Sequence, residues 1–312
     1  MKHYRYCSHG IIINSEIEIA EYQAADDQRF QPDVHIKLGD VAKTGIANPK
    51  WQRHLTQVNI EHVWMDVPGV ARFLITKGIK ITVDPYPGAD NADLCAFLVG
   101  SCMGAILHQR DFLVLHASAV VFQDKLIAIC GQSGAGKSTT ASTFAQRGAQ
   151  IFTDDILVID SHGQAWPGAP NLRLWKSSLD ALGKDVSDYQ QIRRKLPKFS
   201  IPVTKPWPQS GSRSVDAVVI LERHEFVEHI DCISEPIAGI QKFRELEEQI
   251  FRRDAIFAMG HNKKHMIHSA AFVKNIPMLR LKRPTSKFSG NEVTQSILDW
   301  VLPLQENLET VN

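Results

Sequence analysis

The sequence has almost no net charge, no long hydrophobic run and few cysteines, and each shortage excludes a class of protein. Its 35 basic and 34 acidic residues nearly cancel, so no overall field draws the chain to nucleic acid or to an anionic membrane. No stretch is expected to reach the roughly 18 apolar residues of a membrane span, and the start MKHYRYCSHG has no apolar core of a signal peptide. The five cysteines show no Cys-x-x-Cys or zinc-ligand spacing. These absences predict a cytoplasmic protein with reduced thiols, without a nucleic-acid or membrane partner.

The pattern of residues along the chain changes near residue 110, which suggests that the chain has two parts. Before that point, short segments rich in β-branched residues end at Gly or Pro, a pattern typical of strands joined by turns. Residues 1–110 are therefore expected to form a small mixed β domain that ends in a helix, DNADLCAFLVGSCMGAILHQR. Residues 111–312 alternate apolar segments of strand length with helical segments, which predicts an α/β domain.

Within the second part, two segments resist a single assignment. Residues 166–176 and 197–211 are rich in proline and aromatic residues and are expected to be loops or edge segments. The other segments are clearer. Strands are expected in KLIAICG, IFTDDILVID, VDAVVILER and IPMLRLKR, and helices in STTASTFAQRG (with Gly148 as the residue just after the helix), FRELEEQIFRRDAIFAMG and NEVTQSILDWVLPL.

The stretch GQSGAGKST fits the pattern G-x-x-x-x-G-K-[ST], and it follows an apolar strand and precedes a helix, as that phosphate-binding motif requires. Gly131, Gly134 and Gly136 let the backbone turn with its N–H groups pointing inward, and the following helix presents its positive end to the same point, where an anion fits. Lys137 would bring a positive charge to the terminal phosphates, and the Ser138 hydroxyl would complete the coordination of Mg²⁺. A glycine-rich turn with a surface lysine is the alternative. The predicted nucleotide-binding residues are Gly131, Ser133, Gly134, Ala135, Gly136, Lys137, Ser138 and Thr139.

Two neighbouring carboxylates and a histidine flank this loop in the sequence. Asp154 and Asp155 follow a short apolar stretch, so a strand that returns beside the loop strand would bring them to the phosphates. One can hold Mg²⁺ and the other can accept a proton, and their mutual repulsion would raise one pKa unless the metal or Lys137 neutralises it. His116, at the start of the strand LHASAVV, can orient a hydroxyl or a phosphate. The alternatives are a polar turn for the acid pair and a structural histidine.

The run LHASAVVFQDKLIAICGQSGAGKSTTASTFAQRGAQIFTDDILVID resembles the catalytic core of HPr kinase/phosphorylase and its relatives. His116 precedes Lys137 by 21 residues and Asp155 follows it by 18, and both intervals fit the family pattern. The resemblance is specific for residues 113 to 160. It extends more loosely through WPGAPNLRLW and the C-terminal helices, which look like those of related kinases of peptide-modifying gene sets, including lasso-peptide precursor kinases. It implies an HPr-kinase-like P-loop fold for the second part, beside the smaller N-terminal mixed β domain.

The resemblance also implies roles for individual residues. Asp155 would take the proton from a serine hydroxyl with help from His116, Asp154 would support the metal, and Lys137 would stabilise the transferring phosphoryl group. The departures concern the acceptor. Where HPr kinases carry a metal-binding Glu, this chain reads WPGAPNLRLW, in which Arg173 is expected to contact substrate or phosphate instead. The N-terminal part also differs from that of the HPr enzymes, so the acceptor is expected to be another peptide or small protein.

Further basic and aromatic residues suggest a substrate surface. Arg193, Arg194, Lys195 and Lys198 share one short window that can touch phosphates or an acidic peptide, and a solvated basic face is the alternative. Trp166, Trp175 and Trp207 can form a groove for an extended peptide or pack in the core. The two histidines of HNKKH lack the Glu of a zinc-protease helix and predict no metal site.

These observations predict a kinase that uses ATP and Mg²⁺ and phosphorylates a serine of a peptide or small protein. A kinase of a small-molecule alcohol, such as a sugar or an amino acid, remains open. A nucleotide-sensing module that transfers no phosphate is the alternative from another class, and the presence of His116, Asp154 and Asp155 speaks against it. The signature segment of an ABC-type ATPase is absent from the sequence. A homo-oligomer is compatible with these features.

Overall fold

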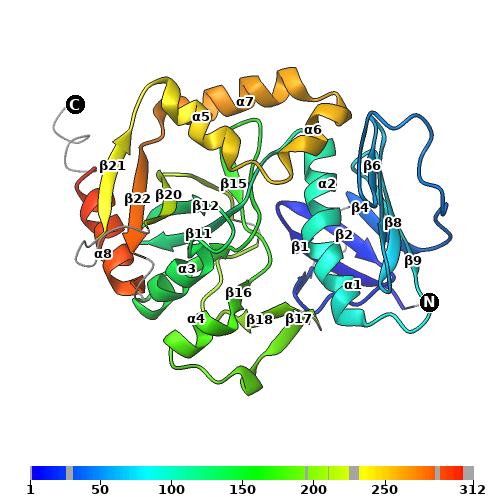
Figure 1. Cartoon of the computed structure of the whole chain (residues 1–312), viewed down its shortest axis with the longest axis horizontal. Helices are drawn as coiled ribbons and strands as arrows, with labels where there is room; N and C mark the ends of the chain where they lie inside the picture. Colours follow the sequence, from blue (N-terminus) through cyan, green and yellow to red (C-terminus); the bar gives the residue numbers. More distant parts are fainter. Residues whose placement is uncertain are drawn as a thin grey trace.

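The structure is a computed structural model that describes residues 2–25, 31–193, 196–209, 211–224, 232–284 and 289–304. Its strands form two large sheets and two small ones, with helices between and around them (Figure 1). The expected mixed α/β architecture is confirmed.

The first large sheet has nine strands from the N-terminal part of the chain, in the order β3-β1-β2-β4-β9-β8-β7-β6-β5. Its central strands alternate between buried and more exposed side chains, as in β8, so one face of the sheet is buried. Only the pairs β2–β4 and β4–β9 are parallel. The strands are β1 Tyr4–Ser8, β2 Ile11–Ser15, β3 Gln23–Ala24, β4 Val34–Leu38, β5 Trp51–Arg53, β6 Thr56–Val58, β7 His62–Val67, β8 Ala71–Thr76 and β9 Lys80–Pro85.

A long helix follows this sheet and lies between it and the rest of the molecule (Figure 1). It consists of α1 (Asn91–Phe97), a π-helical turn (Leu98–Cys102) and α2 (Met103–Gln109). The Asp90 side chain begins it by accepting a hydrogen bond from the backbone N–H of Ala92 at 2.8 Å. The predicted helix is thus confirmed, and its buried residues share one hydrophobic cluster with the sheet.

This helix also corrects one expectation. Asn91–Gln109 is long and apolar enough to cross a membrane by length and composition alone, so the prediction that no stretch reaches that threshold was wrong. In the structure, 72% of its apolar window is buried inside the protein. The apolar residues on all sides of the helix are explained by its two neighbours, the nine-stranded sheet and the remainder of the chain.

The second large sheet has six strands in the order β13-β11-β12-β20-β22-β21, with helices on both faces (Figure 1). Alternate residues of β12 face opposite layers: Ile127 and Ile129 pack toward α3 and α8, whereas Ala128 and Cys130 pack toward α5 and α7. The strands are β11 Ala117–Phe122, β12 Lys125–Gly131, β13 Gln150–Thr153, β20 Ala217–His224, β21 Ile233–Ile237 and β22 Met278–Pro284. The helices are α3 Lys137–Gln146, α5 Ile240–Glu248, α7 Asn262–Asn275 and α8 Gly290–Val301. Gly148 follows the end of α3 with a φ of 95°, as predicted.

The remaining strands form a four-stranded sheet, β10-β14-β15-β19, and a three-stranded sheet, β16-β18-β17. β18 is the central strand of its sheet, so the expectation of loops or edge segments was wrong for that part of residues 197–211. It holds for the edge strand β16 and for residues 167–170 and 203–209, which lie outside the named strands. The prolines of β18 do not disrupt the sheet because they lie near its ends, at positions 197 and 202. The strands are β10 Leu113–Leu115, β14 Leu157–Ile159, β15 Gln164–Trp166, β16 Asn171–Trp175, β17 Gln190–Arg193, β18 Leu196–Pro202 and β19 Arg213–Ser214, and the short helices are α4 Lys176–Ala181, α6 Arg253–Met259 and the 3₁₀ turns Val186–Asp188 and Leu302–Leu304.

Candidate functional site

The strand directions bring several distant segments to one edge of the six-stranded sheet. β11 is antiparallel to both of its neighbours, β12 and β13, while β20 is parallel to β12 and β22 is parallel to β20. The carboxyl ends of β12, β13, β20 and β22 therefore meet at the same edge as the beginning of β11. In open α/β sheets, ligands bind beyond the carboxyl ends of the strands.

The loop between β12 and α3 has the backbone of a phosphate-binding loop. Gly131, Gly134 and Gly136 have φ angles of 136°, 81° and 113°, which side chains rarely tolerate. The ammonium of Lys137, the first residue of α3, donates to the carbonyl oxygens of Gly131 at 2.7 Å and Gln132 at 3.3 Å. Burial lowers the pKa of Lys137, and the positive charge of Lys198 lowers it further. The predicted strand, loop and helix are confirmed.

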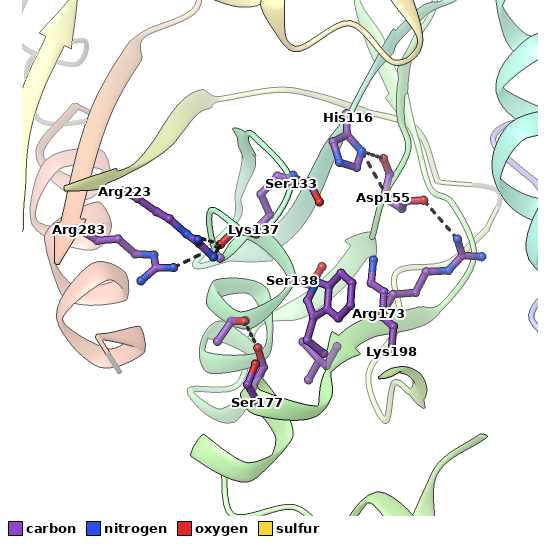
Figure 2. Close-up of a pocket in the computed structure, with 16 residues that line it drawn as sticks. His116, Ser133, Lys137, Ser138, Asp155, Arg173, Ser177, Lys198, Arg223 and Arg283 are labelled. Carbon is purple, nitrogen blue, oxygen red and sulfur yellow. Dashed lines mark hydrogen bonds and ion pairs between the residues drawn. The ribbon is translucent and has the colours of Figure 1, made fainter. Parts of the chain in front are cut away.

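This loop borders a cavity of about 400 Å³ (Figure 2). Of the predicted nucleotide-binding residues, six line the cavity: Ser133, Gly134, Gly136, Lys137, Ser138 and Thr139. Gly131 and Ala135 are buried within the loop and border a neighbouring cavity of about 350 Å³ instead. The loop thus borders both cavities.

Asp154 is buried beside the loop and accepts three hydrogen bonds. Its Oδ1 accepts from the hydroxyls of Ser118 at 2.5 Å and Ser138 at 2.9 Å, and its Oδ2 accepts from the backbone N–H of Arg173 at 2.7 Å. The expected proximity to Ser138 is therefore present. β13 reaches it by a different route from the one predicted, because β11 lies between β13 and β12 in the sheet.

Asp155 turns out of the strand and faces the cavity with His116 (Figure 2). Its φ of 75° is left-handed, and this break splits the predicted strand IFTDDILVID into β13 and β14. His116 lies between β10 and β11, and its Nδ1 is 3.0 Å from the backbone oxygen of Asp155 and 3.4 Å from Oδ1 of the same residue. Because a carbonyl oxygen only accepts, Nδ1 carries the proton and Nε2 keeps a lone pair in the neutral ring.

The charges around Asp155 meet the condition under which repulsion was not expected to raise its pKa, because cations that include Lys137 offset the repulsion. Burial alone would raise the pKa of Asp155, but the charge of Arg173, followed by that of His116 when its ring is protonated and by those of Lys198 and Lys137, holds it below its ordinary value. The pKa of His116 is lowered, first by burial and then by the nearby Lys137. At neutral pH, the site therefore holds an ionised aspartate and a neutral histidine.

Arg173, on β16, joins this carboxylate to the N-terminal part of the chain. One terminal nitrogen, Nη1, lies 3.2 Å from Asp155 Oδ2, and the other, Nη2, lies 2.6 Å from Oε2 of Glu21, between β2 and β3. The side chain is 9% exposed, and its carboxylate partners raise its pKa despite its burial. Arg173 borders the cavity as expected, but both terminal nitrogens are already paired, so its geometry fits holding Asp155 better than contacting substrate.

Arg193, which was also predicted to touch substrate, does not line this cavity. Arg193 lies over the ring of Phe97 in α1, 4.7 Å from its centre, and its Nε is 3.9 Å from Asp93. Arg194 lies outside the described residues. Of the three tryptophans, Trp175 lines the cavity. Trp166 donates to Asp160 and Trp207 to the carbonyl oxygen of Gly211, so the three do not form one groove.

Three cationic residues of the cavity were missed as site residues. Lys198 of β18 was predicted only as part of a short basic segment. Arg223 and Arg283 lie at the carboxyl ends of β20 and β22. A sequence signal existed for Arg223 and Arg283, because the predicted strands VDAVVILER and IPMLRLKR both end in a basic residue. Among the described residues that line the cavity, Asp155 is the one carboxylate beside these cations, so the electrostatics of the cavity favour an anionic ligand.

Neither a protein-family model nor a curated protein sequence matches the chain. Among solved structures, the chain is similar to the HPr(Ser) kinase/phosphatase from Coxiella burnetii, at 10% sequence identity and a TM-score of 0.29, over 63% of this chain and 98% of that chain. The function proposed below therefore rests on the geometry of the site itself.

Proposed function

We propose that this chain is a kinase that transfers the terminal phosphate of ATP, with Mg²⁺, to a serine hydroxyl of a peptide or small protein. A lasso-peptide precursor is one acceptor of this class. The observation that carries the proposal is that the loop lysine, Ser138, Asp155 and His116 border the same cavity. A phosphate-binding loop alone serves many functions, and it is the ionised aspartate facing the phosphate site that favours transfer to an alcohol.

The chain supplies the groups that this reaction requires. The hydroxyl oxygen of the acceptor attacks the terminal phosphorus, the bond to the bridging oxygen of the nucleotide breaks, and Asp155 accepts the hydroxyl proton. His116 assists by holding this base in place, because its Nδ1 donates to the backbone oxygen of Asp155. Lys137 and the loop amides stabilise the charge of the phosphates, since positioning and electrostatics dominate in phosphoryl transfer.

The residues present fit a magnesium ion. Ser138 and Asp154 offer oxygen atoms, the ligands that Mg²⁺ prefers, and they lie within hydrogen-bonding distance of each other. Within the described residues there is no group of three or more His, Cys, Asp or Glu side chains that could hold a metal alone. A magnesium ion here would thus depend on phosphate oxygens for further ligands, and it would neutralise charge on the phosphates.

A kinase acting on a small-molecule alcohol is the second candidate. It is favoured by the size of the cavity, about 400 Å³, which lies in the range of small-molecule sites. A nucleotide sensor without transfer activity is less well supported, because such a protein has no need for Asp155 and His116 in the cavity.

The replacement Asp155→Asn tests the proposal. It should abolish phosphate transfer, a loss of at least a hundredfold because a general base contributes about 10²–10⁴, while Mg·ATP binding remains largely intact. Transfer is measured with labelled ATP and binding by calorimetry. Asp188→Asn, at an exposed carboxylate of a 3₁₀ turn, is the matched control and should leave both unchanged. Full turnover by Asp155→Asn would exclude this residue as the base.

The acceptor is identified in a second experiment. The protein is incubated with labelled ATP and a panel of serine-containing peptides, sugars and amino acids, and the label is located by mass spectrometry. Label on a peptide serine supports the first candidate, and label only on a small alcohol supports the second. ATP binding without transfer to any member of the panel, or to water, would favour the nucleotide sensor.

A further inference from the structure

Two arginines stand directly opposite each other where the sheet meets the phosphate-binding loop. β20 and β22 are parallel neighbours, and their register pairs Arg223 with Arg283. Like charges directly opposite on adjacent strands destabilise a sheet. Such a pair therefore calls for a compensating interaction.

The loop carbonyls provide part of that compensation. Arg223 donates to the backbone oxygen of Gly134 through Nε at 3.0 Å and Nη2 at 2.6 Å, and Arg283 donates to the oxygen of Ala135 through Nε at 2.6 Å. A Cβ atom at Gly134 would lie 2.8 Å from Nη2 of Arg223, and one at Gly136 would lie 3.1 Å from Nε of Arg283. The loop is thus built in close contact with both guanidinium groups.

Within the described part of the chain, no carboxylate pairs with Arg223 or Arg283 to offset the repulsion between them. Neighbouring cations on β22 show the contrast: Arg280 pairs with Glu222 and Glu245, and Lys282 pairs with Glu235 at 2.9 Å. Arg223 and Arg283 form no ion pair among the described residues. Burial, followed by the charge of Arg223, lowers the pKa of Arg283. Among the described residues, the two guanidinium groups therefore have no anionic partner.

Both arginines line the same cavity as the loop, but on the side away from the proposed base. In the sheet, β20 and β22 lie on one side of β12, and β11 and β13, which carry His116 and Asp155 at their ends, lie on the other. Figure 2 shows the same arrangement, with Arg223 and Arg283 on one side of Lys137 and Asp155 on the other. A phosphate chain whose last phosphorus faced Asp155 would have these arginines on its other side, across the loop.

We propose that Arg223 and Arg283 form an anion-binding pair for the phosphates that are not transferred and remain with the departing nucleotide. The ligand class is a diphosphate, either ADP or inorganic pyrophosphate. The assignment rests on the proposed function for the identity of the nucleotide, whereas diphosphate binding by the pair stands on its own. Arginine suits this role because its donors match phosphate oxygens in pairs.

Calorimetric titration with ADP and with inorganic pyrophosphate tests the pair. Arg223→Gln and Arg283→Gln keep a donor for the loop carbonyls but remove the charge, and each should weaken both ligands roughly tenfold to hundredfold, as expected for one charge-assisted contact. Arg223→Lys keeps the charge and should bind more tightly than Arg223→Gln, which separates loss of charge from damage to the loop. The control is Lys282→Gln, which lies on the same strand as Arg283 but outside the cavity lining, and it should bind ADP and pyrophosphate like the wild type.

The outcomes separate this inference from the proposed function. Binding of both ligands that is insensitive to Arg223→Gln and Arg283→Gln overturns the arginine pair, even where transfer from ATP is observed and needs Asp155. A wild-type protein that binds neither ADP nor pyrophosphate overturns it as well. Arginine-dependent binding of both ligands without any phosphate transfer supports the pair and contradicts the kinase.

Discussion

Replacing Glu21 by glutamine should lower the free energy of unfolding and also change the pH dependence of catalysis, although Glu21 lies outside the sheet that carries the site. Its carboxylate holds one terminal nitrogen of Arg173 at 2.6 Å, and the other nitrogen holds Asp155 at 3.2 Å. The Glu21 side chain is 15% exposed and that of Arg173 is 9% exposed, so the pair is mostly removed from water. Without Glu21, the positive charge of Arg173 acts on Asp155 alone.

The magnitude follows from the burial of the pair. Removing one partner of a buried ion pair costs about 3–5 kcal/mol, because the other charge loses its compensation. Since Asp155 still pairs with Arg173 after the substitution, we expect a loss near the lower end, about 3 kcal/mol. For the exposed pair of Glu61 with Lys77, where the side chains are 53% and 55% exposed, Glu61→Gln should cost about 0–1 kcal/mol.

The free energy of unfolding of Glu21→Gln and its control Glu61→Gln is measured with urea, and kcat/KM is measured against pH. In Glu21→Gln the pKa of Asp155 should fall further, so the acidic limb of the profile should move to lower pH and the weaker base should lower the plateau. A purely structural loss does not move the limb. Equal unfolding free energies for the two variants, together with an unmoved acidic limb, would refute the role of Glu21 in positioning Arg173 and Asp155.

Two further predictions concern the loop and the acidic side chain. Gly134→Ala should cost about 1–2 kcal/mol of stability through backbone strain at its φ of 81°, and it should also weaken ADP binding by displacing Arg223. The control Gly163→Ala, at a φ of 78° with open space around it, should show only the strain. Equal ADP affinities of the two variants in a titration would contradict this prediction. The pKa of Asp155 is lowered on folding, so its charge stabilises the protein above the unfolded value of 3.8, and that contribution is lost as pH falls through the lower folded value. The unfolding free energy of the wild type should therefore approach that of Asp155→Asn below about pH 4, and a constant difference down to pH 2 would count against it.

The sequence by itself determined the local features of the site. The glycines of GQSGAGKST encode the left-handed backbone angles of the loop, and the apolar strand before it and the helix after it are readable from the periodicity of their residues. The helix over Asn91–Gln109 was also readable, but its burial was not. A stretch that is apolar all round suits a membrane and a protein interior equally well, and only its two packed neighbours decide between them.

The tertiary structure alone decided which distant charges meet. Glu21 and Asp155 reach Arg173 from segments more than a hundred residues apart, and the register of β20 with β22 places Arg223 opposite Arg283. The same packing makes Arg173, and not Lys137 alone, a cation that lowers the pKa of Asp155, and it turns Arg193 toward Phe97. The physical reason is that a motif records the backbone angles of consecutive residues, whereas electrostatic interactions depend on distances that only strand order, strand direction and register set.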